Sequence, residues 1–188
     1  MVPERQFSTV LAAAKVGAEW AITALYREFH PRLLRYLRAQ APAHGDDLAS
    51  EVWLDVSAGL ERFEGDETAF RRWLFTIASR RLIDLRRADA RMRAFLALLE
   101  RSFDPRDNAD PEAGVLAGSE TEAALARIGR LSPNQAQVVL LRVVAGLTVE
   151  DVAAIVGKKP GAVRVLQHRA LKRLAEELAR EREAVVTQ

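Results

Sequence analysis

Apolar residues recur along almost the whole chain at the three-to-four-residue spacing of amphipathic α-helices. Alternating runs rich in β-branched residues, which would indicate strands, are nearly absent. In the first half the spacing predicts four helices, over residues 8–15, 19–39, 44–63 and 69–100. Gly17 ends the first helix, and Pro31 predicts a kink in the second. We therefore expect an all-α fold in which these four helices close one core.

The composition changes near residue 100. The segment from Glu100 to Glu122 contains seven acidic residues and two arginines, with two prolines and two glycines. Such a composition is typical of a linker. Helical spacing resumes beyond it. We predict two small helical domains, over 1–99 and 122–188, joined by an acidic flexible linker over 100–121 about which the free domains move.

The stretch TVEDVAAIVGKKPGAVRVLQHRALKRL, residues 148–174, predicts a helix-turn-helix. Thr148 and Asp151 have the spacing of a variant capping box, and Gly157 suits the turn before Pro160 begins the second helix. One face of that helix is apolar and should pack inward: Val163, Leu166, Ala170, Leu174 and Leu178. The opposite arc has small residues first and hydrogen-bond donors one turn later, as a DNA-recognition helix does. The candidates for contact with DNA are Lys159, Gly161, Arg164, Val165, His168, Arg169 and Lys172.

Charge is distributed unevenly, although the formal net charge is only +2. Between Arg71 and Arg93 there are eight arginines and only two acidic residues, Asp84 and Asp89. An ordinary solvated helix surface usually mixes both signs, so this block favours binding to phosphate groups.

The predicted third helix has the opposite charge. Asp47, Glu51 and Asp55 are spaced by four and should form one acidic ridge, with the apolar Leu54 beside it. An apolar side chain among acids could dock a basic partner helix. On these residues alone, an ordinary exposed surface explains the pattern equally well.

Several classes of function have little support. The chain has no cysteine, which excludes disulfides, thiolate catalysis and cysteine-ligated zinc. His30 and His44 lack ligand partners at useful spacing, so we expect no metal or cofactor, and no catalytic constellation is evident. No window approaches the length of a membrane span, so we expect a cytosolic protein without membrane insertion. The aromatic residues expected to serve in packing are Trp53, Trp73 and Phe75.

Four segments together resemble the extracytoplasmic-function (ECF) class of bacterial RNA polymerase sigma factors, which direct the polymerase to promoters. They are ALYREFHPRLLRYLRA, DDLASEVWLDV, RFEGDETAFRRWLFTIASRRLIDLRR and GLTVEDVAAIVGKKPGAVRVLQHRALKRL, in the order and spacing of that family. The resemblance covers nearly the whole chain. It implies a sigma region 2 domain, an acidic linker that threads polymerase channels, and a sigma region 4 domain whose helix-turn-helix reads the minus-thirty-five element.

The resemblance also implies roles for individual residues. The acidic helix would dock on the basic clamp helices of the polymerase's largest subunit through Asp47, Ser50, Glu51, Leu54 and Asp55. The loop and helix start would capture an unstacked base of the minus-ten element and hold its strand through Arg62, Phe63, Glu64, Gly65, Asp66, Phe70, Arg71, Arg72, Arg80 and Arg81. An anti-sigma factor is an expected partner, and dimerisation is not required.

This sequence departs from the family pattern at several positions. Ser50 stands where the family often has glutamine, and Arg80 where it often has asparagine. In the recognition helix, VRVLQHR places Val165, Leu166 and Gln167 at the centre, so the promoter preference of relatives does not carry over. Two other functions stay open: a helix-turn-helix regulator that binds duplex DNA alone, and a helical adaptor that binds only protein. The acidic ridge and the RFEGDETAF loop weigh against the regulator, and the basic block weighs against the adaptor.

Overall fold

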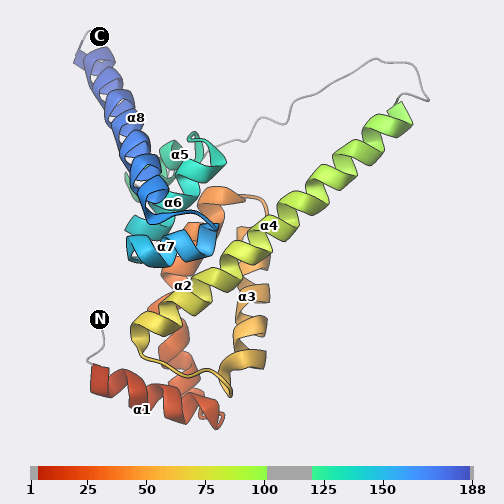
Figure 1. Ribbon diagram of the computed structural model, residues 1–188, viewed down its shortest axis with the longest axis vertical. Coiled ribbons are helices and arrows are strands. Elements are labelled where there is room, and N and C mark those ends of the chain that lie inside the picture. Colours follow the sequence, from red (N-terminus) through yellow and green to blue (C-terminus); the bar gives the residue numbers. More distant parts are fainter. Residues whose placement is uncertain (1–3, 101–119, 187–188) are drawn as a thin grey trace.

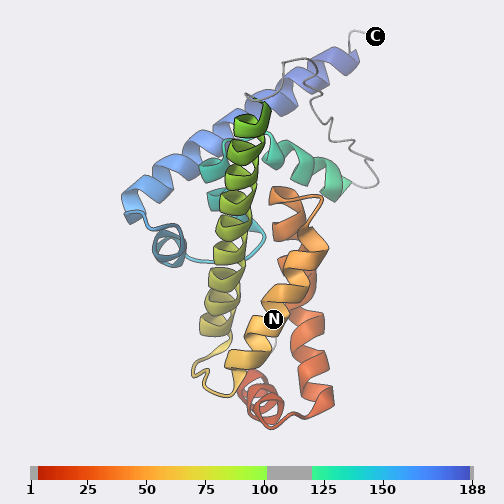
Figure 2. The same cartoon turned by 90° about the vertical axis from the view of Figure 1, so that its right-hand side faces the viewer.

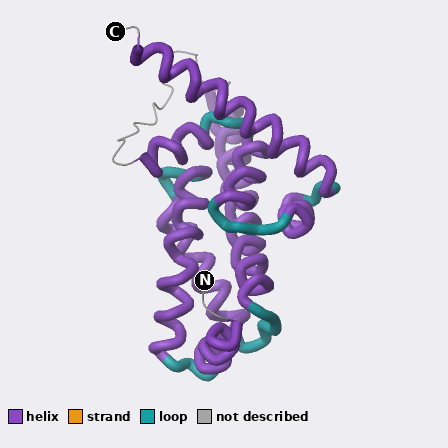
Figure 3. Tube along the Cα trace, turned by 90° about the vertical axis from the view of Figure 1, so that its left-hand side faces the viewer, coloured by secondary structure: helices purple, strands orange, loops and turns teal. Residues whose placement is uncertain are grey.

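A computed structural model describes residues 4–100 and 120–186, and in these two ranges the chain is helical and without strands (Figure 3). The first half contains α1 (Glu4–Lys15), α2 (Glu19–Gln40), α3 (Gly45–Leu60) and α4 (Glu67–Glu100). The second half contains α5 (Glu120–Gly129), α6 (Pro133–Val143), α7 (Val149–Val156) and α8 (Pro160–Val186). The predicted all-α class is confirmed. Residues 101–119, most of the predicted linker, lie outside the described residues.

The first half is a bundle in which α2 packs against α1, α3 and α4 (Figure 1). Pro31 lies inside α2, and the helix continues through it. At one end of the bundle α1 crosses α2, and its Phe7 meets the rings of Phe29 and Phe70 at centroid distances of 6.4 and 5.8 Å. Along α4 a stripe of buried residues at intervals of four faces this core: Phe70, Leu74, Ala78 and Leu82.

The helix-turn-helix of the second half forms as the sequence predicts. The backbone N–H of Asp151 donates to Thr148 Oγ1 at 3.1 Å, and an Asp151 carboxylate oxygen accepts from the Thr148 N–H at 3.4 Å, which completes the capping box. Gly157 ends α7 with φ 65°, a left-handed conformation that favours glycine.

On α8, Val163 and Ala170 are fully buried, and Leu166 and Leu174 are half-buried against the core, so the predicted inner face packs inward as far as Leu174. Leu178, predicted on the same face, is 40% exposed because it lies beyond the part of α8 that packs against the core.

The two halves are in contact. Helices α5 and α6 pack on α2, and α7 packs on α4, so one continuous set of buried side chains runs through both halves. Figure 1 shows α4 running past this contact, with its last turns projecting away from the rest of the chain. The sequence predicts domains that move about a linker, and that motion stays a prediction; in this structure the two halves lie against each other. Among the described helices none is both long and apolar enough to cross a membrane.

Candidate polymerase and nucleic-acid interfaces

The acidic ridge of α3 is exposed, but one arginine of α4 neutralises part of it. Arg81 donates from Nε and Nη2 to the two carboxylate oxygens of Asp55 at 2.7 and 2.6 Å. Its Nη1 lies 3.2 Å from a carboxylate oxygen of Glu51. The hydrogen bonds with Asp55 raise the pKa of Arg81 above its usual value. Arg81, predicted to hold DNA, therefore connects α4 to α3 in this structure.

The rest of the ridge faces outward, and no cation among the described residues pairs with it. Asp47 and Ser50 are exposed, and Leu54 is 70% exposed. Asp46, just before the ridge, receives two hydrogen bonds from the Arg38 guanidinium at 3.1 and 2.7 Å, which lower the pKa of its carboxyl group. The outward surface of α3 is thus an apolar side chain beside a free carboxylate, which suits a partner that carries both apolar and basic groups.

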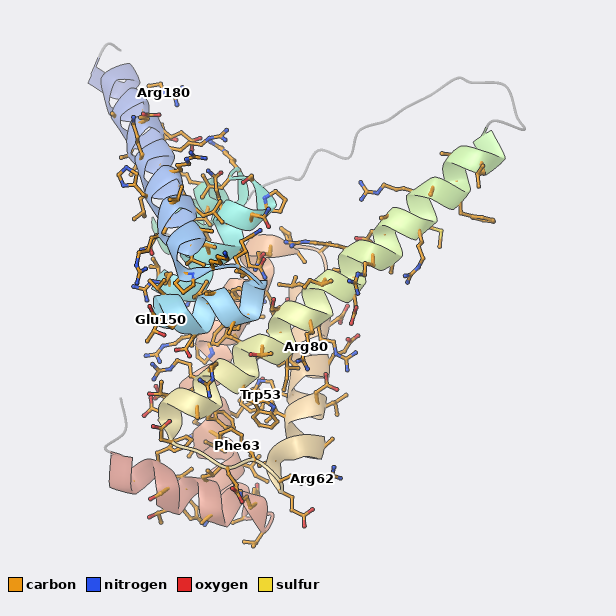
Figure 4. The ribbon with its side chains drawn as sticks, in the orientation of Figure 1. Trp53, Arg62, Phe63, Arg80, Glu150 and Arg180 are labelled. Carbon is orange, nitrogen blue, oxygen red and sulfur yellow. The ribbon has the colours of Figure 1, made fainter. Side chains whose placement is uncertain are left out.

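Trp53 packs sideways against α2, as the sequence predicts for this residue. Its ring lies 5.1 Å from that of Tyr26, and its indole N–H donates to His30 Nδ1 at 3.3 Å (Figure 4). Tyr26 also stacks on His30 at 4.3 Å. Burial lowers the pKa of His30, and the indole hydrogen bond requires the unprotonated nitrogen. This cluster fixes α3 against α2.

The loop between α3 and α4 presents most of the residues predicted to capture a base. Arg62, Glu64, Gly65 and Asp66 are exposed, and Figure 4 shows Arg62 at the end of the bundle where α3 leads into α4. Asp66 Oδ1 accepts the backbone N–H of Ala69 at 2.7 Å and so caps the start of α4. Gly65 has φ 146°, and a Cβ there would lie 2.6 Å from the Ala69 Cβ. The loop conformation therefore requires glycine at this position.

Two aromatic residues support this loop. Phe63 is half-buried and stacks on Trp73 with ring centroids 4.9 Å apart. Phe70, predicted to contact DNA, is fully buried and packs beneath both rings. In this arrangement Phe70 has no surface to offer DNA, because it belongs to the core stripe of α4. Trp73 packs against the core and Phe75 is fully buried, as predicted.

The other arginines of α4 that the sequence predicts to contact DNA lie in different environments. Arg71 pairs with Glu67 in a half-buried position. Arg72 donates to a carboxylate oxygen of Asp151 on α7 at 3.3 Å, and Arg80 is exposed midway along α4 (Figure 4). Arg72 and Arg80 share one side of α4, where they line a cavity of about 290 Å³ between α4 and α7. The residues that line it are Arg72, Thr76, Ser79, Arg80, Ile83, Ala154 and Ile155.

The predicted recognition arc lies on the exposed side of α8 and in the turn just before it, where Lys159 stands. All of its members are exposed: Lys159, Gly161, Arg164, Val165, His168, Arg169 and Lys172. Arg164 is held by Glu150 of α7 at 3.1 Å. Gln167 accepts from Arg142 of α6 at 3.3 Å and Leu166 packs against the core, so Val165 alone of the central VLQ is exposed, at 48%.

Sequence reasoning missed Thr76 and Ser79, which share the cavity side of α4 with Arg72 and Arg80. Their spacing from Arg72, four and seven residues, could have placed them on that side. Within the described ranges no group of three or more histidine or acidic residues is arranged to hold a metal ion.

Comparison with known proteins identifies the family of the chain that carries these surfaces. Residues 25–92 match the Sigma-70 region 2 family and residues 121–174 match Sigma-70 region 4. The ECF RNA polymerase sigma factor ShbA of Streptomyces griseus is 36% identical over 180 residues, which cover 89% of this chain and 94% of ShbA. The chain belongs to the ECF family of RNA polymerase sigma factors. It is therefore a factor of transcription initiation, and the comparisons do not favour the stand-alone regulator.

Other relatives of this sigma factor agree. SigD of Mycobacterium tuberculosis is 33% identical over 181 residues, covering 92% of this chain and 84% of SigD. Among solved structures, CnrH in complex with the cytosolic domain of CnrY has a TM-score of 0.61 at 21% identity, covering 92% of this chain and 97% of CnrH. RpoE in complex with the anti-sigma factor NepR, from Bartonella quintana, has a TM-score of 0.56 at 23% identity, covering 83% and 97%. The similarity to these two structures shows that this chain shares their fold.

Proposed function

We propose that this sigma factor uses three separate surfaces to bring core polymerase to a promoter and to open the promoter DNA. The exposed part of the α3 ridge docks on the polymerase, the loop 62–66 with Arg72 and Arg80 holds the minus-ten strand, and the exposed arc of α8 reads the minus-thirty-five element. The protein itself catalyses no reaction and works in the cytoplasm with the polymerase. One observation carries the proposal: the polar groups of all three surfaces are exposed on one chain, and that chain belongs to the ECF sigma factor family.

Polymerase docking is tested by changing the free part of the ridge. Asp47→Lys combined with Leu54→Ala should weaken binding to core polymerase, because it removes the unpaired carboxylate and the most exposed apolar side chain of α3. Asp89→Lys makes the same charge change on the projecting end of α4 and is the matched control. Equal affinities of the two variants in a fluorescence anisotropy titration with core polymerase would remove α3 from the interface.

Reading of the minus-thirty-five element is tested on α8. Arg169→Ala should weaken promoter binding and lower the slope of log affinity against log salt by about one, as the loss of one phosphate contact does. Arg180 lies on the same helix beyond the arc (Figure 4), so Arg180→Ala is the control for charge. Identical salt slopes for the two variants would exclude Arg169 from the interface.

The loop and α4 are proposed to offset the cost of extracting a base from the stack. Taking a base out of a duplex costs a few kcal/mol. The exposed Arg62 and the half-buried Phe63 supply a cation and a ring for stacking, and Phe63 is held in place by Trp73. An anti-sigma factor is a proposed partner, supported by family membership and by the fold shared with RpoE, which is solved with NepR.

A further inference from the structure

The recognition arc of α8 has a valine at its centre. Of the α8 side chains whose exposure is described, the exposed large apolar ones are Val165, Leu171 and Leu178, and of these only Val165 lies on the arc. Val165 is 48% exposed, with Gly161 one helical turn before it and Arg169 one turn after it. Figure 2 shows the first turns of α8 at the edge of the molecule, next to α7. A partner can therefore reach this side chain from outside.

The stability of the fold does not explain the presence of Gly161 and Val165. A β-branched side chain loses rotamer freedom in a helix, so an exposed valine gives a less stable helix than alanine does. A Cβ at Gly161 would meet no other part of the chain within 4 Å, and its φ is not in the left-handed region. Alanine would thus fit at both positions and would favour the helix. Residues that the fold does not require, placed together on one exposed arc, point to a partner outside the chain.

The chemistry of the major groove identifies what an exposed valine can contact there. The groove edges of adenine, guanine and cytosine carry hydrogen-bond donors and acceptors, whereas thymine also carries an apolar C5-methyl group. The valine side chain has no donor or acceptor, so against a polar base edge it would displace water without replacing the hydrogen bonds of that water. Against a thymine methyl group, two apolar groups leave water together. The match is therefore with thymine.

We propose that Val165 selects a thymine in the minus-thirty-five element by packing on its C5-methyl group, with Gly161 leaving room for the base edge. The inference rests on the proposed function and deepens it, because it takes the arc of α8 as the reader of duplex DNA. Within the arc the tasks are divided. Arg169 positions the helix on the phosphates, and Val165 specifies a base.

Deoxyuridine tests this contact, because its base differs from thymine only in lacking the C5-methyl group. The probe is a duplex promoter fragment that core polymerase transcribes in a run-off assay when this chain is bound to it. Each thymine of the minus-thirty-five element, on either strand, is replaced in turn by deoxyuridine, and the affinity of the polymerase complex is measured by competition. One replacement should weaken binding by about fourfold, as expected for one buried methyl group. The other replacements should have little effect.

Val165→Ala identifies the side chain responsible. It shortens the side chain, so it should weaken binding to the thymine duplex by about fourfold and should abolish the effect of the critical deoxyuridine. The melting temperature should not fall, because alanine favours the helix. Leu171→Ala is the matched control, since Leu171 is 45% exposed and lies about 120° around the helix from Val165. This control variant should keep the full deoxyuridine effect.

The salt dependence of binding distinguishes an apolar contact from a contact with phosphate. An apolar contact releases no counterion, so Val165→Ala should leave the slope of log affinity against log salt unchanged. Arg169→Ala should lower that slope by about one. A lower slope for Val165→Ala would show that the substitution disturbs phosphate contacts, which overturns the inference.

The remaining outcomes separate this inference from the proposed function. A minus-thirty-five element without thymine, or one in which no deoxyuridine weakens binding, overturns the inference while the chain still acts as a sigma factor. A deoxyuridine effect of equal size in Val165→Ala also overturns it, because another residue then reads the methyl group. If the unmodified chain supports neither binding nor transcription of any fragment by core polymerase, the proposed function fails instead.

Discussion

The bridge from Arg81 to the acidic ridge gives a quantitative prediction, because one guanidinium holds two carboxylates of another helix. Arg81→Ala removes two hydrogen bonds to Asp55 and one ion pair to Glu51. A hydrogen bond to a charged group contributes about 1.5–3 kcal/mol when sheltered. The side chains of Arg81 and Asp55 are each 37% exposed, so screening by water reduces the expected coupling to about 1 kcal/mol.

Removing Arg81 has a second cost. Asp55 and Glu51 are four residues apart on α3, and like charges at this spacing destabilise a helix by about 0.2–0.5 kcal/mol. Arg81→Ala should therefore lower the free energy of unfolding by about 1–2 kcal/mol, with a fall in melting temperature of about 2–4 °C per kcal/mol for a chain of this size. The acidic ridge of α3 should gain net negative charge at the same time.

The assay is a double-mutant cycle of Arg81→Ala and Asp55→Asn, followed by urea unfolding and circular dichroism. We expect a coupling energy near 1 kcal/mol. The parallel cycle with Asp47→Asn, which changes a ridge carboxylate that Arg81 does not bind, should give a coupling below about 0.5 kcal/mol. Additive effects of Arg81→Ala and Asp55→Asn would refute the bridge as a stabilising element and would leave Arg81 available to DNA.

Two further predictions concern the supports of the proposed surfaces. Gly59→Ala should destabilise the protein by about 1–3 kcal/mol and alter its tryptophan fluorescence, because the added Cβ would lie 2.7 Å from the Trp73 ring that supports Phe63. An unchanged unfolding curve would contradict this prediction and show that the Trp73 ring shifts freely. The pKa of His30 is lowered in the folded chain, so its contribution to stability should be complete above its unfolded pKa, near 6.5, and should decline as the pH falls through the folded pKa. His30→Gln should flatten this pH dependence of the free energy of unfolding, measured from pH 7.5 downward. An unaltered profile would contradict the lowered pKa of His30.

The helices and the helix-turn-helix were predictable because their signals are local. The capping box needs only Thr148 and Asp151, and the arc of α8 follows from a period of 3.6 residues. Phe70 is buried for an equally local reason. The resemblance implies that it contacts DNA, but its spacing of four from Leu74, Ala78 and Leu82 places it on the core stripe.

Contacts between distant segments could not be predicted in this way. Arg81 and Asp55 are 26 residues apart, and Ser79 and Gln137 are 58 apart. No helical periodicity links residues so far apart in the sequence. Each is a polar residue that is equally compatible with a solvent-exposed position, so its type does not reveal its partner. The packing of the second half on α4 therefore changes the functional account. It brings α7 to one side of α4, where Arg72 donates to Asp151, while Arg72 and Arg80 stay exposed.

The most direct test of the central claim is transcription itself. Purified core polymerase is mixed with genomic fragments, with or without this chain, and the run-off products are sequenced. We predict transcripts that begin at discrete sites only when the chain is present, preceded by shared elements near minus ten and minus thirty-five. Tight binding of the chain to duplex DNA, without association with polymerase and without such transcripts, would contradict the sigma-factor account.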